Sequence, residues 1–366
     1  MNPGQWQTEP NTQPEPMTSL TLRAAALALL IAPLVAGCDS GAPDAPPGIV
    51  PDSTAAPVAR GQLFPVEQNG DHALIDSTGR VVVSLARYNE VGAGSEGLVP
   101  ARYWDGTRTV WDFFDASGAV ALTVAADGAD APRQGLIRVW VDGRSGFVGL
   151  DGRFVVNPYL NDARAFRENV ARVKTTGWQW GLMDRTGRVV VQPEWGELSD
   201  LHDGRARFRD GNLYGYIDAS GREAIPAVYA DARLFSGGVA AVRDGQRWVY
   251  IDRANARTMG GTTFISAGDF GSGLAPVRTE NLWEYVNAAG ARVISPQFEA
   301  ARAFVEGRAA VRIDGRWTFI DTSGATIRAP QYDEVADFSG GLAAVVSGGR
   351  TGYVNRAGNV VWIPRD

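Results

Sequence analysis

The side chains most often used for metal binding and nucleophilic catalysis are rare in this sequence. Its only cysteine is Cys38, and its only histidines, His72 and His202, lie far apart along the chain. This scarcity nearly excludes a cysteine–histidine metal site and a catalytic centre that needs several histidines. We interpret both histidines as ordinary surface or turn residues and expect no metal and no cofactor.

Pairs of carboxylates offer a second kind of chemistry. Glu194 with Glu197, or Asp333 with Glu334, would suit a glycosidase if two acids faced each other about 5–10 Å apart across a cleft. Both pairs fall in expected loops, where nothing distinguishes them from solvated surface. The sequence also contains no nucleotide-binding glycine motif and no nucleophile elbow. We therefore expect a protein that is not an enzyme, with a polysaccharide-acting enzyme as the alternative.

Aromatic side chains recur at regular intervals and could stack on sugar rings or hold an extended peptide. One series comprises His72, Trp111, Ser145, Trp180, Tyr214, Trp248, Trp283, Trp317 and Thr351. Two residues further on stand Phe113, Phe147, Tyr216, Tyr250, Tyr285, Phe319 and Tyr353. A spacing of two places both series on one face of a strand. We favour packing between neighbouring repeats as their role, and keep Trp180, Trp248, Trp283 and Trp317 as candidate binding residues.

A series of cations follows the same interval: Arg102, Lys174, Arg209, Arg243, Arg278 and Arg312. In a regular array these charges could bind an anionic polymer. Aspartates recur equally often, at Asp76, Asp115, Asp184, Asp218, Asp252 and Asp321. We favour the interpretation that the two series pair with each other and that the aspartates also hold turns. Arg209, Arg243, Arg278 and Arg312 remain candidate binding residues. The net charge of −6 argues against nucleic acid as a partner.

These series reflect a repeat of about 34 residues that runs through most of the chain. Nine turn tetrapeptides end at Gly79, Gly118, Gly152, Gly187, Gly221, Asn255, Gly290, Gly324 and Gly358, so that all intervals are 34 or 35 residues except the first, which is 39. The residue pattern within each unit predicts a strand, a turn opened by Asp or Asn and closed by Gly, a second strand and a short third strand. We count eight full units and a final half unit that ends at Ile363.

The segment Trp178-Gln-Trp-Gly-Leu-Met-Asp-Arg-Thr-Gly187 and the segment Arg350-Thr-Gly-Tyr-Val-Asn-Arg-Ala-Gly358 resemble the WG-repeat family. Units of that family combine Gly-Leu-Ala-x-Val, Trp-Gly-Tyr-Ile-Asp-x-x-Gly and Val-Val-Ile-x-Pro. The resemblance covers roughly residues 69–363, although the Trp-Gly pair is intact only at Trp180-Gly181. It implies an interaction or scaffold role and no common catalytic residues.

The expected fold is an all-β tandem array of about eight three-stranded units. Thirty-four residues are few for a four-stranded propeller blade of about 40–45, so we favour an open, twisted, solenoid-like stack. A closed, propeller-like ring is the alternative, in which the final half unit would pair with the first unit.

The N-terminal region has the features of an export signal. An apolar run over residues 20–37, with Arg23 near its start, predicts a signal peptide over residues 1–37, with Met17 as a possible true start. Leu34-Val-Ala-Gly-Cys38 resembles the bacterial lipobox, which implies cleavage before Cys38 and lipid attachment to its thiol. Residues 38–60 are rich in Pro, Ala and Ser and predict a flexible linker to a repeat domain over 61–366.

These observations together predict a non-catalytic, lipid-anchored protein of the bacterial cell envelope, on the periplasmic side or the cell surface. Its repeats would bind a partner protein or an envelope glycan, because repeated units multiply weak contacts over a long surface. The alternatives are the polysaccharide-acting enzyme and a purely structural spacer.

Overall fold

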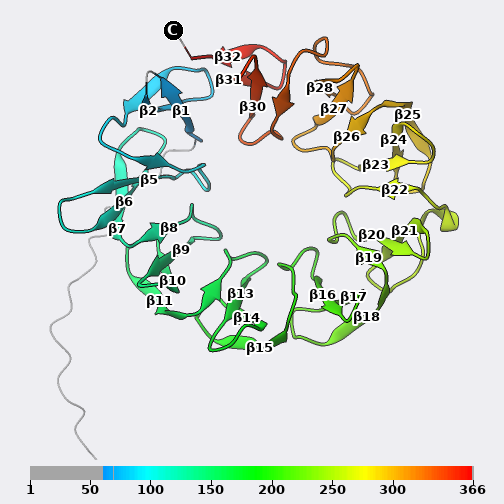
Figure 1. The fold of residues 1–366 in the computed structure, drawn as a ribbon, viewed down its shortest axis with the longest axis horizontal. Helices are drawn as coiled ribbons and strands as arrows, with labels where there is room; N and C mark the ends of the chain where they lie inside the picture. The colour runs from blue at the N-terminus through cyan, green and yellow to red at the C-terminus, as the bar shows by residue number, and fades with distance from the viewer. Residues whose placement is uncertain (1–60, 69, 365–366) are drawn as a thin grey trace, which may run out of the picture. The chain divides into compact units, whose positions relative to one another are not determined.

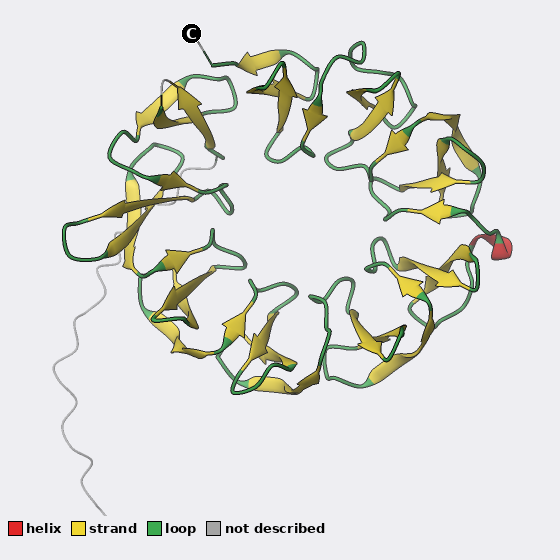
Figure 2. Cartoon of the chain, viewed as in Figure 1, coloured by secondary structure: helices red, strands yellow, loops and turns green. Residues whose placement is uncertain are grey.

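The computed structural model describes residues 61–68 and 70–364, and these form an all-β ring of nine small sheets, called blades 1 to 9 below (Figures 1 and 2). Each blade has three or four antiparallel strands, and the chain builds the blades one after another. The two-residue strands, such as β8 and β22, lie on the inner side of the ring, and strands such as β11 and β15 lie on the outer side (Figure 1).

The strands of blades 1 to 3 are β1 (Phe64–Gln68), β2 (Asp71–Ile75), β3 (Val81–Ser84), β4 (Glu90–Val91), β5 (Val99–Trp104), β6 (Thr109–Phe114), β7 (Val120–Ala125), β8 (Gly128–Ala129), β9 (Leu136–Val141), β10 (Arg144–Gly149) and β11 (Phe154–Leu160). Those of blades 4 to 6 are β12 (Asp162–Ala163), β13 (Val170–Lys174), β14 (Trp180–Asp184), β15 (Val189–Trp195), β16 (Ala206–Asp210), β17 (Leu213–Ile217), β18 (Glu223–Tyr229), β19 (Asp231–Ala232), β20 (Val239–Asp244) and β21 (Arg247–Asp252).

A single 3₁₀ turn, η1 (Met259–Gly261), interrupts the strands of the described part of the chain. The strands of blades 7 to 9 are β22 (Ser266–Ala267), β23 (Leu274–Arg278), β24 (Trp283–Asn287), β25 (Arg292–Phe298), β26 (Ala300–Ala301), β27 (Ala309–Ile313), β28 (Arg316–Ile320), β29 (Glu334–Val335), β30 (Leu342–Ser347), β31 (Arg350–Asn355) and β32 (Val360–Trp362).

The blades are offset from the units read along the sequence. A four-stranded blade begins with a short inner strand and the third strand of one unit, and it ends with the first two strands of the next unit; blades 1 and 5 lack the inner strand, and blades 6 and 8 lack the outer one. Eight full units and a half unit therefore become nine blades. The sequence analysis missed the two-residue inner strands and β1, in which Phe64 and Glu67 replace the small and cationic residues found at the matching positions of most other units.

The glycine of the Trp-Gly pair is required by a bulge in the neighbouring outer strand. In blade 4 the pairing of β14 with β15 shifts register on both sides of Leu182. A β-carbon at Gly181 would lie 2.3 Å from the carbonyl oxygen of Val191, and one at Gly215 would lie 2.6 Å from that of Ile225. In blades 4 and 5 the position therefore fits a residue without a side chain, because the backbone approaches this closely there.

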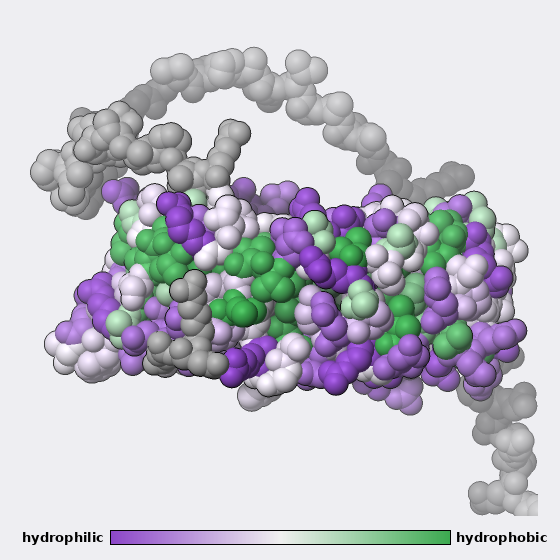
Figure 3. Space-filling model, turned by 90° about the horizontal axis from the view of Figure 1, so that it is seen from above, coloured by the Kyte–Doolittle hydropathy of each residue, from purple (hydrophilic) through white to green (hydrophobic). Residues whose placement is uncertain are grey.

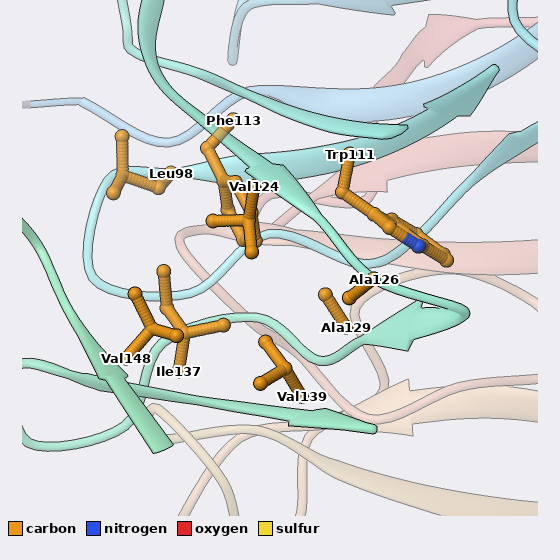
Figure 4. Close-up of a cluster of buried hydrophobic side chains, with 9 residues drawn as sticks. All are labelled: Leu98, Trp111, Phe113, Val124, Ala126, Ala129, Ile137, Val139 and Val148. Carbon is orange, nitrogen blue, oxygen red and sulfur yellow. The ribbon is translucent and has the colours of Figure 1, made fainter. Parts of the chain in front are cut away.

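The hydrophobic core is divided into nine clusters, and each cluster lies between two neighbouring blades of the described ring. Figure 4 shows the cluster between blades 2 and 3. An edge-to-face aromatic pair recurs across the interfaces, for example Tyr216 with Phe235 at 4.8 Å and Tyr285 with Phe304 at 5.0 Å between ring centroids. The second aromatic series thus packs between repeats, as the sequence analysis expected.

The ring is closed, so the expectation of an open stack is wrong and the closed alternative is correct. Blades 9 and 1 share a cluster that contains Phe64, Ile75 and Leu342. The argument from length failed because the inner strand of a blade has only two residues, and such a blade needs fewer residues than one with four full strands. In the described residues no strand is exchanged across this junction, which we call the seam.

Hairpin turns at one end of the ring are tied to the turns of the next blade. The carboxylate of Glu168 in blade 4 accepts hydrogen bonds from the backbone N–H groups of Asp203 (2.6 Å) and Gly204 (2.7 Å) in blade 5. Glu306 makes the corresponding pair of bonds from blade 8 to blade 9, at 2.8 and 2.9 Å. These hydrogen bonds add directional contacts to the apolar interfaces between blades.

The expectations for the signal peptide, Cys38 and the linker concern residues 1–60, which lie outside the described residues. No helix in the described part of the chain is both long enough and apolar enough to cross a membrane.

Candidate functional site

The first aromatic series and the cation series, which look independent along the sequence, form one structural feature. The cation at the end of the third strand is the direct cross-strand partner of the aromatic at the start of the next strand. The pairs are Arg102 with Trp111, Arg209 with Tyr214, Arg243 with Trp248, Arg278 with Trp283 and Arg312 with Trp317. We call each pair an aromatic–cation row.

In some rows the cation lies over the aromatic ring, whereas Trp248 and Trp317 have Arg233 and Arg302 over their rings instead. The Arg278 guanidinium lies 5.8 Å from the centroid of the Trp283 ring, and the Lys174 ammonium lies 4.5 Å from that of Trp180. Such contacts are favourable because the face of an aromatic ring is electron-rich. The rows continue onto the outer strand, where Trp283 opposes Phe298.

The aromatic members of the rows have a structural role first. Trp180 is 8% exposed and belongs to the cluster between blades 4 and 5. Trp248, Trp283 and Trp317 are half-buried and pack against the clusters that join their blade to the next. Arg209 and Arg312 are exposed, whereas Arg243 and Arg278 are half-buried. The candidate binding residues therefore present only part of their surface to solvent.

The cations do not pair with the turn aspartates, so that part of the sequence interpretation is wrong. Arg102 pairs with Glu90 at 3.0 Å and Arg312 with Glu299 at 3.1 Å, and these acids come from the inner edge of the same blade. The turn and the end of the third strand lie at opposite ends of the intervening strand, which separates the two charges.

The role expected for the aspartates within their own turns is confirmed. The Oδ1 atom of Asp184 accepts hydrogen bonds from the backbone N–H groups of Thr186 (2.9 Å) and Arg188 (3.1 Å). The hydroxyl of Thr186 has the largest effect among the bonds that lower the pKa of Asp184 to about 2.

One acid of each pair considered for catalysis is engaged with neighbouring groups. Glu197 forms ion pairs with Arg207 (3.4 Å) and Arg209 (3.7 Å), and Asp333 pairs with Arg316 and accepts a bond from a backbone N–H. Burial lowers the pKa of His202, which is half-buried in a loop of blade 5. Within residues 61–68 and 70–364, no group of three or more His, Cys, Asp or Glu side chains could hold a metal ion.

A pocket at the seam was missed by the sequence analysis. It has a volume of about 480 Å³ and lies between blades 9 and 1, where its lining includes Glu67, His72, Thr351, Tyr353 and Trp362. Both flanking blades lack an aromatic–cation row, because Val346 opposes Thr351 and Glu67 opposes His72. The signal was present in the sequence, since these positions break the first aromatic series.

Comparisons with known proteins identify the repeat. Five segments match the family model of the WG containing repeat: residues 146–177, 180–214, 214–248, 285–317 and 317–350. These five segments are WG repeats. No curated protein matched the sequence.

Solved structures align with this chain at low identity. A eukaryotic initiation factor aligns with a TM-score of 0.50 at 9% identity, over 73% of this chain and 84% of that chain. BamB from Moraxella catarrhalis aligns at 0.37 and 13% identity, over 74% and 91%. Kluyveromyces lactis Hsv2 with loop 6CD replaced by a Gly-Ser linker aligns at 0.40 and 10% identity, over 64% and 94%.

The two residues of the WG motif have separate functions in this ring. The tryptophan forms the aromatic–cation row, and the glycine accommodates the bulge of the outer strand. In blade 7 the glycine position is held by Glu284, whose side chain is 1% exposed, accepts a 2.7 Å bond from the Thr279 hydroxyl and pairs with Arg292. The pairing of β24 with β25 has the same register shifts, so in blade 7 the bulged outer strand accommodates a side chain, whose buried charge is paired.

Proposed function

We propose that this chain is a non-catalytic scaffold of the bacterial cell envelope that binds a partner protein and is held at a membrane by lipid on Cys38. The binding surface is the end of the ring that carries the connections from β5 to β6, from β9 to β10 and their equivalents, here called the tip face. All blades have the same strand order, so these connections lie at the same end.

The observation that supports a protein partner is the exposure of two large aromatic side chains on the tip face. Trp178, in the connection between β13 and β14, is 88% exposed, and Trp104, at the end of β5, is 62% exposed. Tryptophan is enriched at the energetically dominant positions of protein interfaces, because it buries a large area at a small loss of conformational entropy.

The charge distribution favours a protein over an anionic polymer. Three cations of the rows pair with acids of the same blade: Arg102 with Glu90, Arg209 with Glu197 and Arg312 with Glu299. The net charge of the chain is −6. A polyanion would have to displace these ion pairs, whereas an aromatic anchor on a partner protein would not.

The rim of the ring differs from the tip face. Hydrophobic residues lie there among hydrophilic ones, as the edge-on view in Figure 3 shows. Exposed rim residues such as Val81 and Val360 are smaller than the tryptophans of the tip face. Scattered exposed aliphatic side chains are normal on soluble proteins, so the tip face is the better candidate for recognition.

The test is capture of a partner from envelope extract by the full chain, followed by crosslinking and mass spectrometry. We expect saturable capture of one protein, reduced about tenfold by Trp178→Ser together with Trp104→Ser. Phe154→Ser is the matched control, because Phe154 is 46% exposed at the opposite end of blade 3. Capture of a glycan instead would favour the glycan-binding alternative, and a folded chain that captures nothing would contradict the proposal and favour a spacer.

A further inference from the structure

The aromatic member of each row fills space between its own blade and the next. Trp283 packs against the cluster that joins blades 7 and 8, and Trp317 against the cluster that joins blades 8 and 9. By the same geometry, position 351 in blade 9 faces the junction of blades 9 and 1. Thr351 occupies that position, and its side chain is much smaller than an indole.

The seam pocket lies where this aromatic ring is missing. Both Thr351 and Tyr353, the two positions that face the next blade, line it. Its volume of about 480 Å³ is within the range of about 300–1,000 Å³ found for small-ligand sites. In chemical terms the pocket is a copy of the gap in which blades 2 and 4 to 8 place an indole or a phenol, whereas blades 1 and 3 have His72 and Ser145 at that position.

The walls of the pocket suit an aromatic ring. Tyr353 and Trp362 line it from blade 9, with their ring centroids 6.5 Å apart, and Pro65 and Val66 line it from blade 1. The hydroxyl of Tyr353 is already bonded to the carbonyl oxygen of Pro65. The ring is therefore held in place, and its face and edge are available for packing.

The pocket is lined by charges of both signs, from Glu67 and Arg350. Glu67 stands where a typical row has its cation, and it is exposed among the lining residues. A carboxylate is a hydrogen-bond acceptor that complements the N–H of an indole or the O–H of a phenol. Apolar aromatic walls with an acceptor at one side are complementary to tryptophan and tyrosine side chains.

We propose that the seam pocket receives a tryptophan or tyrosine side chain of the partner protein, which takes the position that Trp317 holds in blade 8. This inference rests on the proposed function. The bound side chain fills the aromatic position that Thr351 leaves open and so couples partner binding to closure of the seam.

In the experiment, Thr351→Trp places an indole of the chain itself in the pocket. Thr351→Ser is the matched control, because its small side chain leaves the pocket open. The probe is N-acetyl-tryptophanamide, with N-acetyl-alaninamide as the negative control, and binding is measured by calorimetry with the full chain. We expect saturable binding of the probe to the wild type and to Thr351→Ser, and a loss of about tenfold or more in Thr351→Trp. Glu67→Gln should weaken probe binding about threefold while the Tm stays unchanged.

Folding of the variants is checked by thermal unfolding, and the Tm of Thr351→Trp should equal or exceed that of the wild type because the gap is filled. Thr351→Phe provides a second filled variant if Thr351→Trp does not fold. Equal probe binding by the filled variants and the wild type would overturn the assignment.

Capture of the partner protein separates the two proposals. If the wild type and Thr351→Ser capture it and the filled variants do not, both proposals are supported. If the filled variants capture it as well as the wild type does, the seam inference is wrong while the scaffold function stands. If the wild type captures no protein but binds the probe, the scaffold proposal and its partner side chain both fail, and the pocket is a site for a free aromatic molecule.

Discussion

The hydroxyl of Tyr353 donates a hydrogen bond to the carbonyl oxygen of Pro65, 3.0 Å away, and thereby joins two residues 288 positions apart in the chain. The same bond recurs within the ring, where Tyr285 donates to the carbonyl oxygen of Arg302 at 2.8 Å. The interface at the seam thus contains the same tyrosine-to-carbonyl hydrogen bond as an internal interface. Its apolar cluster is smaller, however, with four buried residues against seven to nine in other clusters of the described ring.

We expect Tyr353→Phe to lower the free energy of unfolding by about 1 kcal/mol, because the carbonyl oxygen of Pro65 loses its partner. Amide hydrogen exchange should become faster in β1 and β31 and stay unchanged in β14. Tyr285→Phe is the comparison, since it removes the equivalent bond at an internal interface. Exchange that rises equally in every blade after Tyr353→Phe would show that the seam is not a separate opening unit.

Gly181→Ala should destabilise the ring by about 1–3 kcal/mol or more, because the new methyl group would meet the carbonyl oxygen of Val191 at 2.3 Å. Gly196→Ala adds the same atoms where nothing lies within 4 Å, and should change stability little. Urea unfolding of the two variants measures the difference. Equal midpoints would mean that the bulge does not explain the glycine of the WG motif.

Stability should fall as the pH is lowered from about 4 to about 2. Hydrogen bonds from Thr78 and Thr186 lower the pKa values of Asp76 and Asp184 from 3.8 to about 2 in the folded state. Groups with a lowered folded-state pKa stabilise the protein above the unfolded-state value, and that contribution is lost as the pH falls through the folded-state value.

Urea midpoints measured across this pH range test the assignment. Asp184→Asn should flatten the dependence, and Glu223→Gln, which removes an exposed carboxylate at the start of β18, should leave the slope of the wild type. A slope unchanged by Asp184→Asn would contradict the role given to this turn.

Cys38→Ser should move the protein from the membrane fraction to the soluble fraction of cells, because a lipid on this thiol supplies the proposed anchor. Mass spectrometry of the mature wild type should find its N-terminus at a lipid-modified Cys38. An unmodified thiol in the mature chain would rule out the anchor.

Local patterns were sufficient to predict the turns and most strands. The spacing of Asp184 and Gly187 specifies a hairpin turn through residues only three apart, so sequence alone identifies it. The row of Arg243 and Trp248 was harder to foresee, because it depends on the cross-strand register of β20 with β21. Ring closure was not predictable, since Phe64 and Tyr353 meet only after every intervening blade has been placed.

The seam has a consequence for how such rings can change in size. Each blade is made of consecutive residues, and the first and last blades meet through side chains rather than through a shared sheet. Duplication or deletion of one whole repeat in the gene would therefore leave every hydrogen-bonded strand pair intact. Only the angle between neighbouring blades would have to adjust. The number of blades can therefore change by one at a time, and no form with an unpaired strand has to occur in between.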